Sequence, residues 1–179
     1  IVMMDIDKLK KIKAIAFDID GVMTDGGILA TSDGDLLRMF DAKDSFGVRM
    51  AKLNGLITCV ITGGASDSIK KRFVYCGVDE EDVYLHSRIK MEEFDDFCSR
   101  HSLSYDEVMY FGDDLPDIDV LKACGIGVAP ADAVAEAMEA ADYVSPYKGG
   151  HGCVRNAIEA VMKAQGIWKL DNALYKKLF

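Results

Sequence analysis

Four carboxylates stand in two short clusters, each at the end of an apolar run of the chain. Asp18 and Asp20 come at the end of the run 14–19, and Asp113 and Asp114 follow the run 108–111. Carboxylates that are brought within a few ångströms of one another repel strongly, so a cation must compensate their charge. Hard divalent cations prefer oxygen ligands, and Mg²⁺ is the default where phosphate is also bound. If the two clusters converge in the fold, the sequence predicts a magnesium site.

A hydroxyl and an ammonium group occupy comparable positions. Thr62, followed by Gly63 and Gly64, comes after the apolar run 56–61, and Lys90 begins the helical segment that precedes the run 108–111. In an open α/β sheet, ligands bind beyond the carboxyl ends of the strands. We therefore expect Thr62 and Lys90 to lie beside the acidic clusters, where the lysine offsets part of their charge. Thr62 could instead only cap a helix, and other cations could replace the lysine: Lys70, Lys71 and Arg88.

The elements that must position these residues alternate along the chain. Apolar runs predict buried strands at residues 14–19, 56–61, 108–111 and 126–128. Segments of helical period lie between and after them, at residues 45–54, 67–76, 91–100, 118–124 and 131–141. This alternation predicts an α/β fold, a doubly wound parallel sheet with helices on both faces.

One segment breaks the alternation. Two short apolar runs, 27–30 and 36–40, flank the turn-forming residues 31–35, which predicts a β-hairpin of about residues 23–41 directly after the first strand. A lone hairpin is marginally stable in water, so we expect it to pair with copies in other subunits. No linker separates a second domain, which predicts a single domain over residues 1–179 with a tail at about 166–179. The apolar residues that the hairpin is expected to expose are Ile28, Leu29, Leu36, Leu37, Met39 and Phe40.

Charge and composition exclude several classes of protein. The formal net charge is −9 over 179 residues, which disfavours nucleic-acid binding because that needs a concentrated basic surface. No apolar run approaches the roughly 18 residues of a membrane span, and no signal-peptide pattern is found. The five cysteines are scattered without a CxxC pair, as is typical of reduced thiols in a cytoplasm. We therefore expect a cytoplasmic protein that binds neither nucleic acid nor membrane.

The candidate residues form four motifs, each at a predicted strand end or helix start. They are Asp18-Ile19-Asp20-Gly21, then Ile61-Thr62-Gly63, then Lys90, then Gly112-Asp113-Asp114-Leu115-Pro116-Asp117. In this order the motifs resemble those of the haloacid dehalogenase (HAD) superfamily of phosphotransferases, and the resemblance covers roughly residues 12–165.

The resemblance implies a role for each motif residue. Asp18 would attack phosphorus to give an aspartyl-phosphate, and Asp20 would protonate the leaving oxygen and later deprotonate water. Thr62 and Lys90 would bind the remaining phosphoryl oxygens.

It also implies a ligand set for Mg²⁺. Asp18, the backbone carbonyl of Asp20, and Asp113 would hold the ion. Asp114 or Asp117 would support it from a second layer, and the sequence leaves open which of them does so. Asp117 could equally be a carboxylate favoured at a helix start.

The spacing of the motifs leaves no room for an inserted cap domain. A capless domain with this hairpin, with residues 44–47 opening a helix and a glycine-rich turn at 149–155, resembles one subgroup of the superfamily. That subgroup comprises tetrameric phosphatases of 3-deoxy-D-manno-octulosonate 8-phosphate (KDO-8-phosphate), and the resemblance extends to phosphatases of nine-carbon, sialic-type sugar acid phosphates. We therefore expect a homotetramer acting on an anionic sugar acid phosphate. A non-catalytic HAD-like oligomerisation module is the alternative from another class.

The resemblance also suggests where the sugar acid is bound. Two positions depart from the subgroup pattern: Gly64, where arginine or an acidic residue is usual, and His151, where a GGRG turn is usual. Both departures affect the expected length of the substrate rather than the chemistry. The expected contacts to the sugar acid or its phosphate are Thr62, Gly63, Gly64, Lys43, Arg49, Arg72, Lys90, His151 and Arg155.

Overall fold

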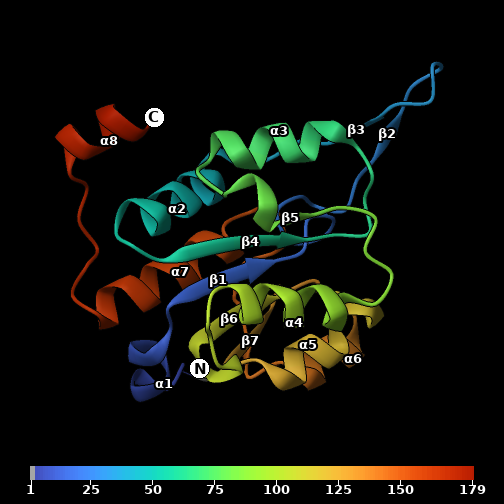
Figure 1. Ribbon diagram of the computed structural model, residues 1–179. Coiled ribbons are helices and arrows are strands. Elements are labelled where there is room, and N and C mark those ends of the chain that lie inside the picture. Colours follow the sequence, from blue (N-terminus) through green and yellow to red (C-terminus); the bar gives the residue numbers. More distant parts are fainter. Residues whose placement is uncertain (1–2) are drawn as a thin grey trace.

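The computed structural model describes residues 3–179 and contains a six-stranded sheet in the order β5-β4-β1-β6-β7-β8. Every neighbouring pair is parallel, which confirms the predicted doubly wound α/β fold. The central strand β1 carries an acidic cluster at its carboxyl end and has β4 and β6 beside it (Figure 1). The strands of the sheet are β1 (Ala14–Phe17), β4 (Ile57–Ile61), β5 (Val83–Tyr84), β6 (Val108–Phe111), β7 (Ile126–Ala129) and β8 (Tyr143–Val144).

Helices cover both faces of the sheet. Alternate side chains of β1 point to opposite faces: Ile15 and Phe17 join one hydrophobic cluster, and Ala14 and Ala16 join the other. The first cluster packs under α1 (Ile6–Lys11), α2 (Ala42–Leu53), α3 (Asp67–Tyr75) and α7 (Cys153–Ala164). The second packs under α4 (Lys90–Arg100), α5 (Ile118–Ala123) and α6 (Ala135–Ala140). Short 3-10 turns lie at η1 (Glu80–Asp82), η2 (Tyr105–Glu107) and η3 (Leu115–Asp117).

Several boundaries differ from the predicted ones. The first strand ends at Phe17 rather than at residue 19, because the carbonyl of Ile19 accepts the N–H groups of Val22 and Met23 in a tight turn. The predicted helix 131–141 is shortened to α6, and the tail contains a further helix, α8 (Asn172–Leu178). The sequence patterns missed α1, α7, α8 and β8. Within residues 3–179, no helix is both long and apolar enough to cross a bilayer.

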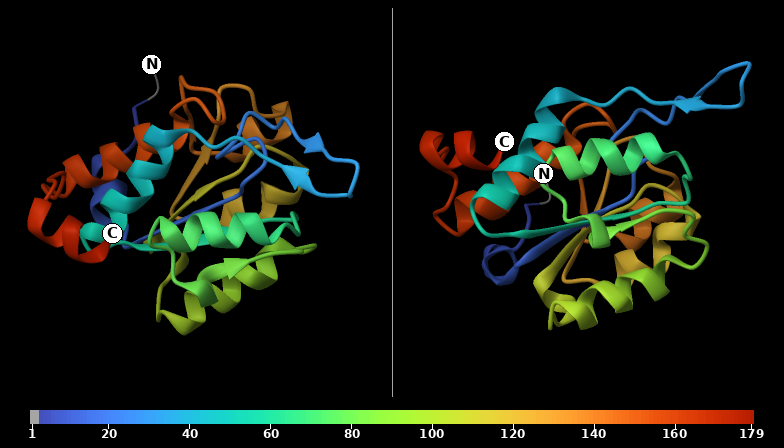
Figure 2. Two further views of the ribbon diagram at one scale, coloured as in Figure 1. Left: turned by 90° about the horizontal axis from the view of Figure 1, so that it is seen from above. Right: turned by 45° about the horizontal axis from the view of Figure 1, so that its top comes forward.

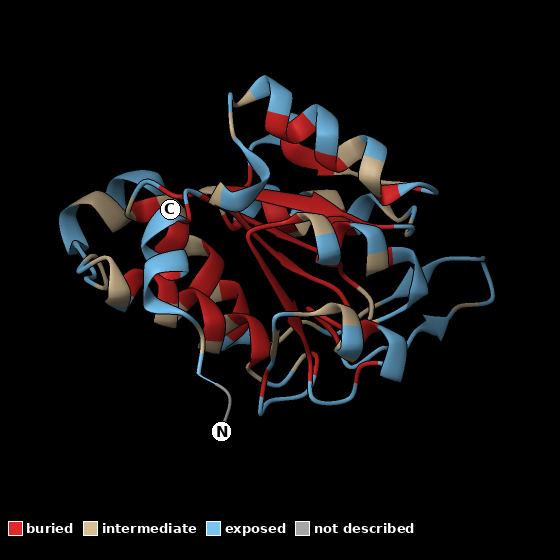
Figure 3. Ribbon diagram, turned by 90° about the horizontal axis from the view of Figure 1, so that it is seen from below, coloured by how far each residue is buried: buried red, intermediate tan, exposed pale blue. Residues whose placement is uncertain are grey.

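The predicted hairpin is present and projects from the body of the domain (Figures 1 and 2). It consists of β2 (Leu29–Ala30) and β3 (Leu36–Leu37), which pair antiparallel. Its strands are exposed, in contrast to the buried central strands β1, β6 and β7 of the sheet (Figure 3). The expectation for Phe40 was wrong: its ring is half-buried and packs edge-on against Phe73 at 5.4 Å, because the chain returns there to the body of the domain. The exposed apolar residues are Ile28, Leu29, Leu36, Leu37 and Met39.

Candidate active site

The ends of three neighbouring strands and the start of one helix meet at a single cavity of about 640 Å³. Asp18 follows β1, Thr62 follows β4, Asp113 follows β6, and Lys90 is the first residue of α4. The predicted convergence of these residues at the carboxyl edge of the sheet is therefore present. The lining includes every polar and charged side chain of the motifs and several of the glycines: Asp18, Asp20, Thr62, Lys90, Asp113, Asp114 and Asp117, with Gly21, Gly63 and Gly64.

A buried ammonium group lies between two buried carboxylates on the floor of the cavity. Lys90 Nζ is 2.9 Å from Asp18 Oδ2 and 2.7 Å from Asp117 Oδ1. The second oxygen of Asp18 accepts the N–H of Ile19 at 2.7 Å. Burial raises the pKa of Asp18 to about 7 even though the charge of Lys90 opposes the shift. Burial alone would lower the pKa of Lys90, but the charges of Asp18 and Asp117 outweigh it and raise that pKa.

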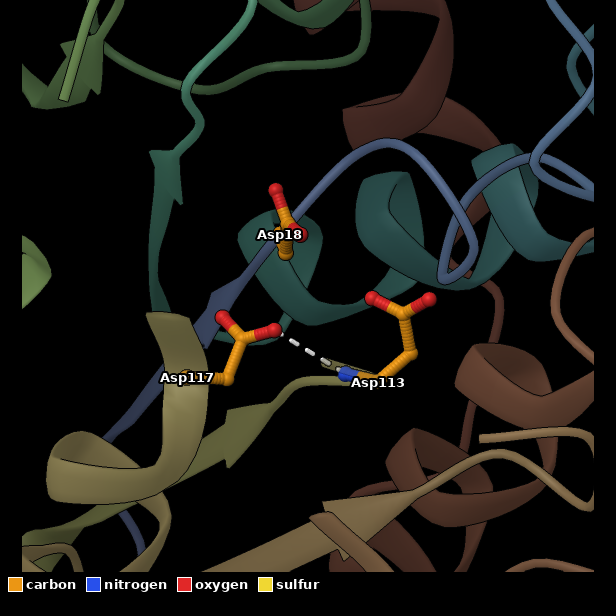
Figure 4. Close-up of side chains that lie close together, drawn as sticks. All are labelled: Asp18, Asp113 and Asp117. Atoms are coloured by element: carbon orange, nitrogen blue, oxygen red, sulfur yellow. Dashed lines mark hydrogen bonds between the residues drawn. The ribbon is translucent and has the colours of Figure 1, made fainter. Parts of the chain in front are cut away.

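Asp113 has a buried carboxylate oxygen whose surroundings favour a bound cation. Asp18, Asp113 and Asp117 lie close together at the ends of β1 and β6 (Figure 4), and one oxygen from each of the three lies within 4.8 Å of the others. Oδ1 of Asp113 is buried and has no hydrogen-bond partner among the residues that the structure describes. Burial, together with the charges of Asp18 and Asp117, raises the pKa of Asp113 to about 7. A hard divalent ion would satisfy the free oxygen and offset the repulsion, so the donor set fits Mg²⁺.

Asp117 and Asp114 have different surroundings. Asp117 is fully buried, and its Oδ1 accepts the hydroxyl of Tyr110 at 2.6 Å in addition to the ammonium of Lys90. Its Oδ2 accepts the backbone N–H groups of Asp113 and Asp114 at 3.0 and 3.2 Å. The exposed carboxylate of Asp114 instead accepts the N–H of Leu115 at 2.7 Å at the start of η3. Asp117 therefore fixes the loop that carries Asp113.

Asp20 has a partner that the sequence analysis missed. Arg38, on the returning side of the hairpin, donates from Nε to Asp20 Oδ1 at 2.6 Å and from Nη2 to Oδ2 at 3.0 Å. Its Nη1 donates to Leu36 O and Ser66 Oγ, both at 3.2 Å. The side chain of Arg38 is only 3% exposed and that of Asp20 is 29% exposed, so this two-point ion pair is shielded on the arginine side and open on the side of the carboxylate. The sequence signal was a single cation inside the apolar run 36–40.

Close backbone packing holds the turn that follows Asp20. Gly21 has φ +84°, and a Cβ there would lie 1.9 Å from Asp113 Oδ2. The glycine-rich turn before α7 packs on the other side, because a Cβ on Gly149 would lie 1.9 Å from Gly21 O. Buried Asp44 anchors that turn by accepting the N–H groups of Gly152 and Arg155 at 3.0 and 2.8 Å. The glycine-rich turn thus supports the loop of Asp20.

Thr62 begins a second turn at the cavity. Its side chain is buried and accepts the N–H of Gly64 at 3.1 Å. A Cβ on Gly64 would lie 3.2 Å from Arg38 Nη2, and a Cβ on Gly63 would lie 3.5 Å from Arg88 Nη1. A side chain at Gly64 would also lie 2.9 Å from Ile69 Cδ1, so Gly64 packs closely against its neighbours, whereas Gly63 has room for an ordinary contact.

The structure does not bring Arg49 or Arg72 into this cavity. The guanidinium of Arg49 lies over the rings of Tyr75 and Phe179 and donates to the hydroxyl of Tyr175 at 2.9 Å. These contacts attach α8 to α2 and α3, which is a packing role. Arg72 lies on α3, outside the cavity lining, and its Nε is buried without a hydrogen-bond partner.

The other expected sugar contacts also lie outside the lining. Lys43 is exposed, and within residues 3–179 its ammonium makes no ion pair; its backbone carbonyl accepts Arg155 Nη1 at 3.5 Å. The ring of His151 turns back to Gly149 O at 2.9 Å. Arg155 pairs with Glu159 and lies over Trp168. Sequence spacing could not distinguish these local packing contacts from contacts with a ligand.

Comparisons with known proteins agree with this geometry. The model of the haloacid dehalogenase-like hydrolase family matches residues 81–158. Over 168 residues, the chain is 33% identical to the 3-deoxy-D-manno-octulosonate 8-phosphate phosphatase KdsC of Escherichia coli (strain K12), covering 94% of this chain and 87% of the relative.

Solved structures show the same likeness. The phosphatase of that name from Yersinia pestis superposes with a TM-score of 0.88 at 29% identity, covering 91% of this chain and 87% of the other. The one from Moraxella catarrhalis, solved with magnesium ion, phosphate ion and KDO, gives a TM-score of 0.87 at 28% identity, covering 91% and 92%.

The parallel sheet, the carboxylate cluster at its edge and these matches define a hydrolase, and the chain belongs to the haloacid dehalogenase-like family. Within that family it is similar, over nearly its whole length, to phosphatases of KDO-8-phosphate.

Proposed function

We propose that this protein is a Mg²⁺-dependent phosphomonoesterase that hydrolyses KDO-8-phosphate to KDO and phosphate. The observation that carries the proposal is the cluster of Asp18, Lys90 and Asp113 in one cavity, in a chain 33% identical to such phosphatases. A module that only drives oligomerisation has no need of a buried lysine held between two carboxylates.

Asp18 is the nucleophile in this proposal. One carboxylate oxygen attacks phosphorus, the bond to the sugar oxygen breaks, and an aspartyl-phosphate forms. The N–H of Ile19 and the ammonium of Lys90 hold the carboxylate in place. Thr62 and Lys90 also bind phosphoryl oxygens. Asp18, the Asp20 carbonyl and Asp113 would hold Mg²⁺, which when bound screens the carboxylate from the phosphate and stabilises charge on its oxygens.

Asp20 moves the protons. It donates one to the departing sugar oxygen and, as a carboxylate, takes one from the water that attacks the aspartyl-phosphate. The guanidinium of Arg38 donates two hydrogen bonds to the carboxylate of Asp20 and so orients it for both proton transfers. Each oxygen of Asp20 accepts one hydrogen bond from Arg38 and keeps a second lone pair, which can carry the proton of the first step.

The length of the sugar acid is the main alternative. A phosphatase of a nine-carbon sugar acid 9-phosphate, of the KDN or sialic acid type, would use the same chemistry. Nη2 of Arg38 lies 3.2 Å from the position of a Cβ on Gly64, so a guanidinium stands close to where the eight-carbon subgroup usually has arginine. This supports the eight-carbon substrate.

Phosphate release from KDO-8-phosphate and from a nine-carbon analogue, with the purified protein and Mg²⁺, tests the assignment. We expect kcat/KM to be at least tenfold higher for KDO-8-phosphate. A preference for the nine-carbon substrate would support the alternative, and no release from either would contradict the proposed function.

The proposed function also includes an oligomeric state and a cellular compartment. We propose one domain per chain and a homotetramer in which the apolar hairpin contacts neighbouring subunits, because Leu29 and Leu37 are 65% and 45% exposed in the single chain. We place the enzyme in the cytoplasm, in lipopolysaccharide synthesis. All five cysteines are buried and free, as expected in a reducing compartment.

A further inference from the structure

The charges that line the cavity are unequally paired. Two of the three lining cations have carboxylate partners: Lys90 contacts Asp18 and Asp117, and Arg38 contacts Asp20. The charge of a bound Mg²⁺ would balance the remaining acidic groups. Arg88 is the third cation, and within residues 3–179 no carboxylate oxygen lies within 4.0 Å of it. Its positive charge is therefore available to a ligand.

The orientation of Arg88 leaves one edge of its guanidinium free. Nη1 donates to Gly63 O at 3.1 Å and to Ser87 O at 3.2 Å, which fixes the group against the turn after β4. Among the described residues, Nε and Nη2 have no hydrogen-bond partner. These two groups form the edge that matches a carboxylate with two parallel hydrogen bonds.

The depth of Arg88 distinguishes it from Lys90. Lys90 is buried beside Asp18, where the phosphoryl group would react, whereas Arg88 is exposed two residues earlier at the mouth of the cavity. A 2-keto sugar acid phosphate carries its carboxylate and its phosphate at opposite ends of the carbon chain. Such a molecule needs one cation deep in the cavity and a second one near its mouth.

We propose that Arg88 binds the carboxylate of the substrate and so selects sugar acid phosphates over neutral sugar phosphates. This assignment rests on the proposed function. The backbone of Gly63 and Ser87 holds Nη1, so the free edge of Arg88 has a fixed place at the cavity.

The test compares KDO-8-phosphate with arabinose 5-phosphate, which has a similar phosphate ester and no carboxylate. In Arg88→Gln, kcat/KM for KDO-8-phosphate is expected to fall about 10- to 100-fold, mainly through KM, as the loss of a charge-assisted pair predicts. The value for arabinose 5-phosphate should stay within threefold. Arg88→Lys keeps the charge but lacks the planar edge, so its kcat/KM for KDO-8-phosphate should lie between those of the wild type and Arg88→Gln.

Lys122→Gln, on the exposed side of α5, is the control for the loss of one positive charge. It should change neither substrate's kcat/KM by more than twofold. Equal losses on both substrates in Arg88→Gln, or no loss on either, would overturn the role of Arg88. If the wild-type enzyme releases phosphate from arabinose 5-phosphate but not from KDO-8-phosphate, the proposed function itself fails.

Discussion

Replacing Lys90 by methionine would remove the ammonium that separates two buried carboxylates. Lys90 Nζ lies 2.9 Å from Asp18 Oδ2 and 2.7 Å from Asp117 Oδ1, and the side chain of Asp117 is 0% exposed. Methionine keeps most of the length and the apolar stem of lysine, so the change tests the charge rather than the packing.

The magnitude follows from the contacts that remain. Removing one partner of a buried ion pair costs about 3–5 kcal/mol, because the other partner is left buried and uncompensated. After the change, Asp117 still accepts the hydroxyl of Tyr110 and two backbone N–H groups, and Asp18 still accepts the N–H of Ile19. These hydrogen bonds place the expected loss at the lower end, at about 3 kcal/mol. In a domain of this size, that loss lowers Tm by about 6–12 °C.

Thermal and urea unfolding, followed by circular dichroism in EDTA, would measure the loss without a divalent cation to replace the ammonium. Lys122→Met is the matched control, and its Tm should stay close to that of the wild type because the side chain is exposed. With Mg²⁺, kcat of Lys90→Met should fall about 10²- to 10³-fold, as for the removal of one donor to a reacting oxyanion. A Tm within 2 °C of the wild type would refute the argument that Lys90 compensates buried charge.

The other predictions concern the nucleophile, the metal, the proton donor and the hairpin. Asp18→Asn should abolish turnover, and activity within tenfold of the wild type would refute the nucleophilic role. EDTA should remove activity, with Mg²⁺ restoring it and Ca²⁺ restoring it poorly; full activity after chelation would argue against a metal. Arg38→Met releases Asp20 and should lower kcat on the sugar phosphate about 10- to 100-fold. The loss of kcat should be smaller on p-nitrophenyl phosphate, because its leaving group needs no proton. Equal losses on the two substrates would contradict this role. The double variant Leu29→Asp/Leu37→Asp should have a smaller mass in light scattering, and an unchanged mass would place the assembly contact elsewhere.

The site positions were predictable because they follow strand ends. Asp18, Thr62 and Asp113 each come directly after a buried apolar run, and the rule for parallel sheets then places them at one edge. The choice between Asp114 and Asp117 was not predictable. It depends on the hydrogen bonds that Asp117 makes with Lys90 and with the backbone of its own loop, and spacing along the chain does not encode these.

The cations of the cavity were harder to predict than its carboxylates. Arg49 and Arg155 were expected at the substrate, but aromatic rings and Glu159 hold them elsewhere. Arg88 was considered only as a substitute for Lys90. A long cationic side chain can reach many partners from one backbone position, so its location depends on tertiary contacts.

Arg38 links the hairpin to the reaction within a single subunit. The hairpin was expected to pair with copies in other subunits, yet its returning side carries the guanidinium that holds Asp20 of the same chain. The double variant at Leu29 and Leu37 changes the exposed strands and leaves Arg38 in place, whereas Arg38→Met releases Asp20 and leaves the apolar strands intact. If cover by a neighbour controls selectivity, the first variant should lose preference for the sugar acid and keep the leaving-group dependence of the wild type. If the ion pair controls proton transfer, the second should remain assembled and show a steeper dependence of kcat on the leaving group.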